Sequence, residues 1–436
     1  MATTEGTPNG GWARPFFTLW SAQQLSLVGS AVAGFGLIWW VTRETGSALA
    51  LTGSALVAML PGLVLGPFVG ALVDRWSRRV VMVVADGVVA LFSAWLVYLM
   101  WADVLQMWHV YLILFVRGLG GAFHWPAVSS SISLMVPEKH LARVQGLDHT
   151  MMGLRNIASP SVGALLVALL PLHWVMAVDV VTAVLAIVLV MATPIPRPQR
   201  QGEAKTTVLR DVLEGIFFIR RWPGVAVLMT LAVVANFIAW PLNSLLPLLV
   251  TKHFGRGALE LGWLQSAWGI GMLAGGLTLS AWGGFKRQML TSLIGLMGLG
   301  VGVVFVGFSP ATMLWLALLG QGIFGFCNPI CNGPIYAILQ AKVPNYMQGR
   351  VFTLVGSLCS AAAPLGLLVA GGVSEIAGPR LWFQVGGWVF ILGALTSLMI
   401  PSVFYLEDAV LTQGNLEQRA PTEEETSLDA STTPSA

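Results

Sequence analysis

Long apolar runs dominate the chain between residues 15 and 405. A helix needs about 20 apolar residues to cross a hydrocarbon layer about 30 Å thick. The runs are continuous rather than alternating, so they predict membrane-spanning helices and not the strands of a closed barrel. The pattern predicts an all-α polytopic membrane protein with spans at residues 15–41, 49–72, 79–100, 107–136, 142–170, 173–194, 224–250, 259–282, 288–308, 311–341, 348–373 and 380–405.

A polar stretch divides these spans into two groups of six. It begins at a proline-rich segment and continues as an amphipathic pattern over residues 206–221, which predicts a helix lying along the membrane interface. The C-terminal tail is rich in Glu, Thr, Ser and Pro, a composition typical of disorder. The predicted parts are an N-terminal segment 1–14, a six-helix bundle 15–194, a linker 195–222, a second six-helix bundle 223–405 and a tail 406–436.

The two groups also share a short sequence repeat. Val136-Pro137, Arg143-Val144 and Leu147 recur 207 residues later as Val343-Pro344, Arg350-Val351 and Leu354, at the turn after the fourth span of each group. Paired halves with helices interrupted by Pro and Gly are typical of secondary transporters. The repeat therefore favours two pseudo-symmetric bundles.

Composition narrows the possible functions. Only 10% of the residues are charged and 56% are hydrophobic, against about 25% charged in a soluble domain. The sequence has no phosphate-binding glycine loop and no cluster of metal-ligand type, and its three cysteines lie in apolar segments. We expect no enzymatic activity, no cofactor and no metal site, and an ion gradient as the energy source.

The distribution of basic residues predicts the topology. Of the 23 Lys and Arg residues, 16 fall on the side of the predicted N-terminus and four on the other side. By the positive-inside rule both termini are cytoplasmic. This asymmetry explains the net charge of +3 without a nucleic-acid partner. We expect a multi-pass protein of the plasma membrane, monomeric, with membrane lipids and a small amphipathic substrate as its partners.

The turn after the second span carries the most specific motif. It places three arginines and one carboxylate in a few residues, at Gly70, Asp74, Arg75, Arg78 and Arg79. Such charges can form contacts that latch two halves together, although the arginines could also be topology anchors alone. The run resembles the signature loop of the major facilitator superfamily, with Ser77 in place of a glycine. The equivalent turn at 276–287 lacks the acid.

A few charges lie within the predicted spans. Arg117, Asp148 and Arg155 are the main ones, and Asp86 is a further candidate. Buried charges in a membrane are costly and usually functional, so these four predict a proton-coupling site, with static ion pairs as the alternative. The resemblance supports this prediction, because Arg117 matches a span-four element associated with proton coupling in drug exporters. We expect Asp179 to be interfacial.

The fifth span has a helix-packing motif at Gly153, Ser159, Pro160 and Gly163. Small residues allow close helix approach, and a proline bends a helix. The motif resembles the antiporter element of the same superfamily in a degenerate form.

The second bundle offers amides and aromatic residues rather than charges. Asn243 and Asn332 are among its polar groups, and tryptophans near the bundle centre could stack on an apolar ligand. The candidate cavity residues are Gln23, His124, Asn236, Trp240, Gln265, Trp268, Gln321 and Asn328. Membrane-belt or packing roles are the alternative for the tryptophans.

Within the superfamily the chain resembles the macrolide-efflux and siderophore-exporter branch. The stretches that carry this resemblance are 23–30, 117–137 and 211–221. It implies proton-driven efflux of bulky amphipathic compounds, by multidrug-type antiport and alternating access. A lipid or lysolipid flippase of the same fold is an alternative, and a non-transporting membrane sensor is another.

Overall fold

A computed structural model describes residues 12–194, 223–342 and 345–400. Within these ranges the chain forms twelve α-helices and no strand. The predicted linker helix at 206–221 and the tail lie outside the described residues. The helices are α1 (Ala13–Thr45), α2 (Ala48–Arg75), α3 (Arg78–Trp101), α4 (Met107–Met135), α5 (Glu138–Leu169), α6 (Leu172–Ala192), α8 (Pro223–Lys252), α9 (Ala258–Trp282), α10 (Gln288–Phe308), α11 (Leu314–Lys342), α12 (Asn345–Ala377) and α13 (Pro379–Leu398).

Ten of these helices are long and apolar enough to cross a membrane by length and composition. The described parts of α4 and α9 fall short because both carry polar residues: α4 contains His109, Arg117 and His124, and α9 contains Glu260 and Gln265. Each predicted span corresponds to one helix, so the all-helical fold of twelve helices is confirmed.

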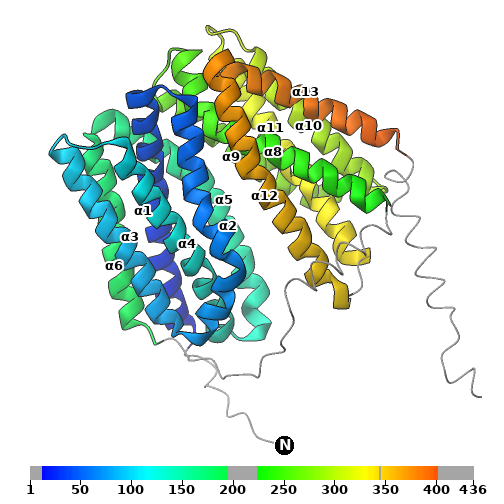
Figure 1. The fold of residues 1–436 in the computed structure, drawn as a ribbon. Helices are drawn as coiled ribbons and strands as arrows, with labels where there is room; N and C mark the ends of the chain where they lie inside the picture. Colours follow the sequence, from blue (N-terminus) through cyan, green and yellow to red (C-terminus); the bar gives the residue numbers. More distant parts are fainter. Residues whose placement is uncertain (1–11, 195–222, 343–344, 401–436) are drawn as a thin grey trace, which may run out of the picture.

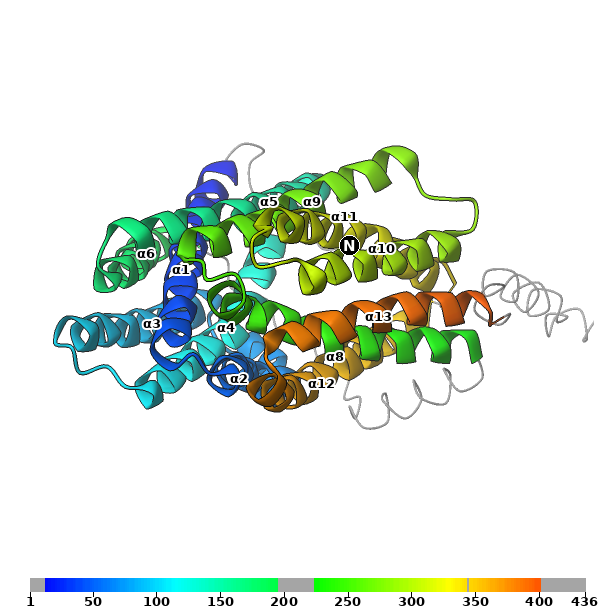
Figure 2. The same cartoon turned by 90° about the horizontal axis from the view of Figure 1, so that it is seen from above.

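The helices form two groups of six, α1–α6 and α8–α13, which stand side by side (Figure 1). Since each helix runs opposite to the one before it, all turns lie on two sides. We call the side where α1 begins and α2 ends at Arg75 the proximal side, and the side where α1 ends at Thr45 the distal side. Seen from above, α5 adjoins α9 and α2 adjoins α12 (Figure 2). The fifth helix of each group thus packs on the second helix of the other, as a pseudo-two-fold arrangement requires.

The α5–α9 contact depends on two glycines of α9. A Cβ on Gly262 would lie 2.5 Å from the Cβ of Ala164 and 2.9 Å from the carbonyl oxygen of Pro160. A Cβ on Gly269 would lie 3.0 Å from the carbonyl oxygen of Asn156. Only glycine at these positions lets the two backbones approach so closely. Pro160 of the predicted packing motif of α5 therefore lies at the junction of the two halves.

Hydrogen bonds between the halves also lie on the distal side. The Glu375 carboxylate at the end of α12 accepts the backbone N–H groups of Ala48 (2.7 Å) and Leu49 (3.2 Å) and the Ser47 hydroxyl (3.0 Å) at the start of α2. Ser244 of α8 donates to the Leu51 carbonyl oxygen. Towards the proximal side the ribbons of the two groups diverge (Figure 1). Among the described residues, this arrangement is closed distally.

Candidate functional site

A cavity of about 410 Å³ lies between the two halves. Its volume is within the range of small-molecule sites. Helices α1, α2 and α5 line one wall, and α8, α9 and α11 line the other. The lining residues are Ala31, Gly34, Phe35, Ile38, Ala55, Arg155, Asn156, Ser159, Pro160, Trp240, Asn243, Ser244, Leu246, Pro247, Leu261, Gln265, Trp268 and Gln321.

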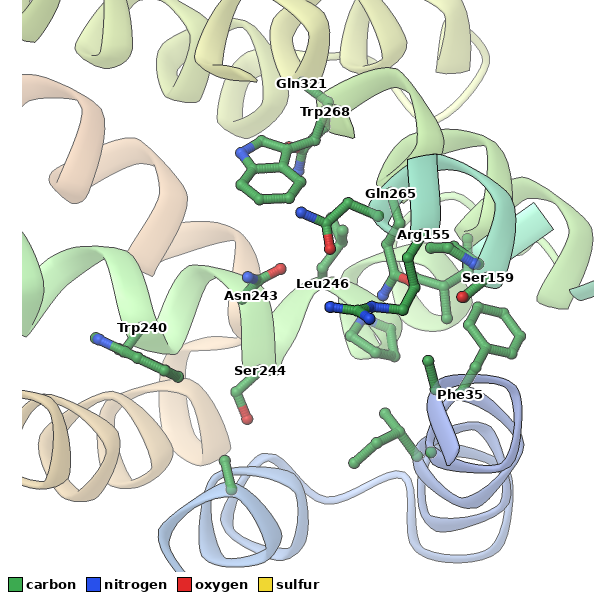
Figure 3. A pocket seen from close by; sticks show the side chains of 18 residues that line it. Phe35, Arg155, Ser159, Trp240, Asn243, Ser244, Leu246, Gln265, Trp268 and Gln321 are labelled. Carbon is green, nitrogen blue, oxygen red and sulfur yellow. The ribbon is translucent and has the colours of Figure 1, made fainter. Parts of the chain in front are cut away.

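The cavity wall is aromatic and amide-rich with a single cation. Arg155 is the one charged side chain among the described residues that line it. Figure 3 shows Arg155 extending from α5 towards the centre, where Gln265, Trp268 and Asn243 also point. Such a wall can stack on an apolar ring system and offer a few hydrogen bonds to polar substituents.

Four of the predicted cavity residues lie at this wall: Trp240, Gln265, Trp268 and Gln321. Gln23 and His124 instead line a smaller pocket within the first half. Asn236 donates to the carbonyl oxygen of Ala232 in its own helix and does not line the cavity, and Asn328 does not line it either. Any role of these residues in binding stays a prediction.

Arg155 is connected to Asp148 through one glutamine. Arg155 Nη1 donates to Gln24 Oε1 at 2.9 Å, and Gln24 Nε2 donates to Asp148 Oδ1 at 3.0 Å. The Trp20 indole N–H also points at Asp148 Oδ1, at 3.3 Å. Asp148 and Arg155, seven residues apart on α5, are thus joined by a bridge from α1. A change at the cavity cation can reach the carboxylate through two hydrogen bonds.

A second charged cluster lies away from the cavity wall. Arg117 Nη1 contacts Asp179 Oδ2 at 2.6 Å, and the same carboxylate accepts the hydroxyls of Ser30 (2.6 Å) and Ser93 (2.8 Å). Arg117 Nη2 donates to the Ser30 carbonyl oxygen at 2.7 Å. These bonds tie α1, α3, α4 and α6 together.

The expectation that Asp179 is interfacial is therefore wrong. Its side chain is 1% exposed and pairs with Arg117. Asp179 is the eighth residue of α6, about 10 Å below the distal end of that helix. A position close to the end of a helix favours an interfacial site. Asp179 is buried nevertheless, because α1, α3 and α4 surround its carboxylate and supply its partners.

A third charged contact joins α3 and α4. His124 Nε2 lies 3.3 Å from Asp86 Oδ1, with both side chains largely buried. The pair lacks hydrogen-bond geometry, and Asp86 Oδ2 also has no hydrogen-bond partner among the described residues. Asp86 is thus adjacent to a titratable partner that the sequence did not predict.

The packing motif of α5 divides between two contacts. Gly163 packs against Phe35 of α1. A Cβ added to Gly163 would lie 3.1 Å from the Cβ of Phe35. Ser159 and Pro160 line the cavity, and Ser159 is 4% exposed. Gly153 lies farther from its neighbours, with only Leu273 within 4.0 Å of an added Cβ.

The structure describes only part of the predicted latch. Arg79 donates to the carbonyl oxygen of Thr193 at the proximal end of α6, and Arg78 is buried at the start of α3. Of Gly70, Asp74 and Arg75 the structure describes the helical backbone alone. Closure by this turn stays a prediction.

Several functional candidates were missed from the sequence. Gln24, Ser30 and Asn156 are polar residues within apolar spans, and that isolation was a usable signal. Phe35 and Ala55 also line the cavity, but the sequence carries no signal for them. An apolar residue on a predicted span does not indicate which helix face meets the other half.

Known proteins resemble this chain along most of its length. The family model for the Major Facilitator Superfamily matches residues 19–367. Macrolide efflux protein A of Streptococcus pyogenes is 31% identical over 398 residues, covering 91% of this chain and 98% of the relative. The multidrug efflux pump Tap of Mycolicibacterium fortuitum is 30% identical over 392 residues, covering 87% and 94%.

Solved structures agree on the fold. A bacterial homologue of the lysosomal transporter Spinster, in an inward-facing and unoccupied conformation, superposes with a TM-score of 0.67 at 13% identity, covering 93% of this chain and 99% of the other. A D-xylose–proton symporter superposes with a TM-score of 0.66 at 13% identity, covering 87% and 96%. The matched family model, the two efflux relatives and the twelve-helix fold lead to one conclusion: the chain is a membrane transporter that belongs to the major facilitator superfamily.

Proposed function

We propose that this transporter exports bulky amphipathic compounds, of macrolide or siderophore type, from the cytoplasm in exchange for protons by alternating access. The observation that carries the proposal is the chain of two hydrogen bonds from Arg155 in the cavity wall, through Gln24, to the Asp148 carboxylate. The efflux relatives support the substrate class, since macrolide and multidrug efflux appear in their names.

The cavity favours large apolar ligands with few polar groups. Two tryptophans and Phe35 offer flat apolar surface, whereas Gln265, Gln321 and Asn243 supply amides. A sparse set of polar groups selects by shape more than by a fixed pattern of hydrogen bonds. This agrees with export of several related compounds.

The proposed coupling acts through Gln24, whose amide bridges Asp148 and Arg155. While Asp148 is ionised, it accepts the Gln24 amide, and Gln24 Oε1 holds Arg155. A protonated Asp148 is a weaker acceptor, because hydrogen bonds to ionised groups are stronger than those to neutral ones. Protonation then loosens Gln24 and frees Arg155 to change position in the cavity. Substrate and proton would thereby influence each other through one arginine.

The Arg117–Asp179 cluster fits a structural role better. Its carboxylate makes three contacts with groups from three other helices and lies outside the cavity wall. We therefore assign coupling to Asp148 and Arg155, while Arg117 and Asp86 remain candidates.

A transport assay with an imposed pH gradient tests this function. Purified protein is reconstituted in vesicles with a radiolabelled macrolide, and the gradient is set in either direction. We expect macrolide to move against the proton flow, and a reversed gradient to reverse its movement. Failure of any macrolide, dye or siderophore to follow the gradient would refute the proposal. Gradient-independent movement of a fluorescent lysolipid would favour the flippase alternative.

A further inference from the structure

A small polar pocket lies within the first half, beside the central cavity. Its volume is about 40 Å³, and α1, α4 and α5 enclose it. The polar groups in its wall are Trp20, Gln23, Gln24, His124, Asp148 and Arg155. Arg155 lines both this pocket and the central cavity, so the two spaces share one wall.

Several polar atoms at this pocket lack hydrogen-bond partners among the described residues. Gln23 is 2% exposed, yet neither its Nε2 nor its Oε1 has a partner. His124 Nε2 is equally without a hydrogen bond, although it lies near Asp86. Burying a polar group without a partner costs about 1–3 kcal/mol, so a side chain with two such atoms needs a ligand.

Water is the ligand that fits this pocket. A buried water needs about 10–15 Å³ and two to four polar partners, so 40 Å³ holds about three or four waters. Gln23 offers both a donor and an acceptor, and His124 and Asp148 stand in the same wall. A larger solute would not enter this volume. A metal ion is disfavoured because the Arg155 cation lines the same wall.

We propose that this pocket holds a short water chain, positioned by Gln23, that carries the coupling proton between Asp148 and His124. The inference rests on the proposed function, in which Asp148 is the coupling acid. Asp148 gives its proton to a water, that water gives one to the imidazole, and the carboxylate is left to bind Gln24. His124 then releases a proton, leaving a neutral ring beside Asp86. Each step moves one proton and leaves the waters unchanged in number.

The surrounding charges are compatible with this route. From α5, Arg155 faces Asp148 through Gln24, and from α3, Asp86 faces His124. Arg117 on α4 is occupied by Asp179 of α6. In α1, the groups that face the pocket are neutral. His124 Nε2 lies 3.3 Å from Asp86 Oδ1, so the imidazole has a carboxylate beside it on the side of α3.

Radiolytic labelling of the wild-type protein in isotopically labelled water tests the water chain without transport. Phe16 and Leu19 line the pocket but are 0% and 2% exposed, so radicals reach them only from internal water. We expect both to be labelled strongly, and Phe390, which is 2% exposed and lines neither this pocket nor the cavity, to be labelled weakly. Equal weak labelling of Phe16 and Phe390 would overturn the proposal.

Transport by Gln23→Leu and His124→Gln tests the proton route. Leucine keeps most of the volume but removes both amide atoms, and glutamine keeps hydrogen bonding but does not titrate. We expect each variant to lose about tenfold in gradient-driven macrolide transport, with macrolide–macrolide exchange within about twofold of wild type. Asp148→Asn is the reference.

Asp148→Asn distinguishes a failure of the water chain from a failure of the proposed function. If Asp148→Asn abolishes gradient-driven transport while both pocket variants keep it, the water chain is refuted and the proposed function stands. If Asp148→Asn keeps gradient-driven transport, the proposed function itself fails. If Gln23→Leu does not fold, the labelling of the wild-type protein decides.

Discussion

The two halves of this transporter share a fold but are stabilised differently. The first half contains the Arg117–Asp179 ion pair and a close contact between His124 and Asp86. In the second half, glycines repeatedly bring helix backbones into direct contact: a Cβ on Gly271, Gly275 or Gly325 would lie 2.0–2.1 Å from a backbone carbonyl oxygen. The first half has a comparable contact at Gly118, where an added Cβ would lie 2.2 Å from the carbonyl oxygen of Ala58. Hydrogen-bonded charges can be rearranged by a proton, whereas such backbone contacts cannot. This difference supports the proposal that the first half supplies coupling and the second a rigid wall.

The largest effect is expected from breaking the buried ion pair of the first half. Asp179→Ala leaves Arg117 without its carboxylate in an apolar bundle and should destabilise the protein by about 3–5 kcal/mol. The measurement is thermal unfolding in detergent. The double variant Arg117→Met/Asp179→Leu should recover most of the loss. If both single and double variants unfold at the wild-type temperature, the cluster does not hold this half together.

A smaller loss is expected from a methyl group in the second half. Gly275→Ala places a Cβ 2.0 Å from the carbonyl oxygen of Phe326 and should cost about 1–3 kcal/mol by forcing α9 away from α11. Gly276→Ala is the matched control, because nothing lies within 4 Å of its added Cβ. Thermal unfolding of both variants measures the difference. Equal stability would show that the second half is more adaptable than the comparison implies.

Aromatic truncation in the cavity comes next in size. Trp268→Ala removes a flat surface from the wall and should weaken macrolide binding about tenfold, or about 1.4 kcal/mol. Trp315→Ala is the control, because Trp315 is on α11, 61% exposed and away from the cavity. Binding is measured by equilibrium dialysis or scintillation proximity. Loss of affinity in both variants would place the ligand elsewhere.

The smallest effect is expected at the distal closure. Glu375→Gln removes the negative charge of a side chain that accepts the first N–H groups of α2 from the other half, which is worth about 0.3–1 kcal/mol. The distal-open population should rise severalfold. The measurement is the spin-label distance between Val104 and Ala311, both exposed on the distal side, in a background with the three native cysteines replaced.

Glu260→Gln provides the control for that experiment. Glu260 caps the start of α9 by accepting the Gly257 N–H at 2.9 Å, but within its own half. It should lower stability slightly without changing the distance distribution. If Glu375→Gln leaves the distribution unchanged as well, Glu375 does not hold the halves together.

The fold could be predicted almost completely from the sequence, because each span is a continuous apolar run with its own polar boundaries. The side-chain partners of the buried charges could not be predicted in the same way. Arg117 was recognisable as a buried charge, but its partner Asp179 lies 62 residues away on α6. The two residues meet because α3 packs against both α4 and α6. Gln24 can bridge Asp148 and Arg155 only because α1 is rotated so that this side chain faces α5. A membrane helix is apolar on all sides, so its sequence pattern does not reveal that rotation.

The cavity shows the same limit. The polar and aromatic residues of the apolar spans include Trp240, Gln265, Trp268 and Gln321, and the structure places all four at the wall. Asn236 and Asn328 are also polar residues of these spans but lie elsewhere. Asn236 lies one turn before Trp240, and Asn328 lies two turns after Gln321, so each shares a helix face with a wall residue. Their depth along the helix, which the sequence pattern does not give relative to the other half, places them outside the cavity.

The central claim is that Asp148, in the first half, couples proton movement to a substrate held between both halves. The most direct test compares two assays of Asp148→Asn in the same vesicles. We predict that macrolide–macrolide exchange stays within about threefold of wild type, because Asp148 does not line the cavity, while accumulation driven by a pH gradient is lost. Gradient-driven accumulation at the wild-type level in Asp148→Asn would contradict the account.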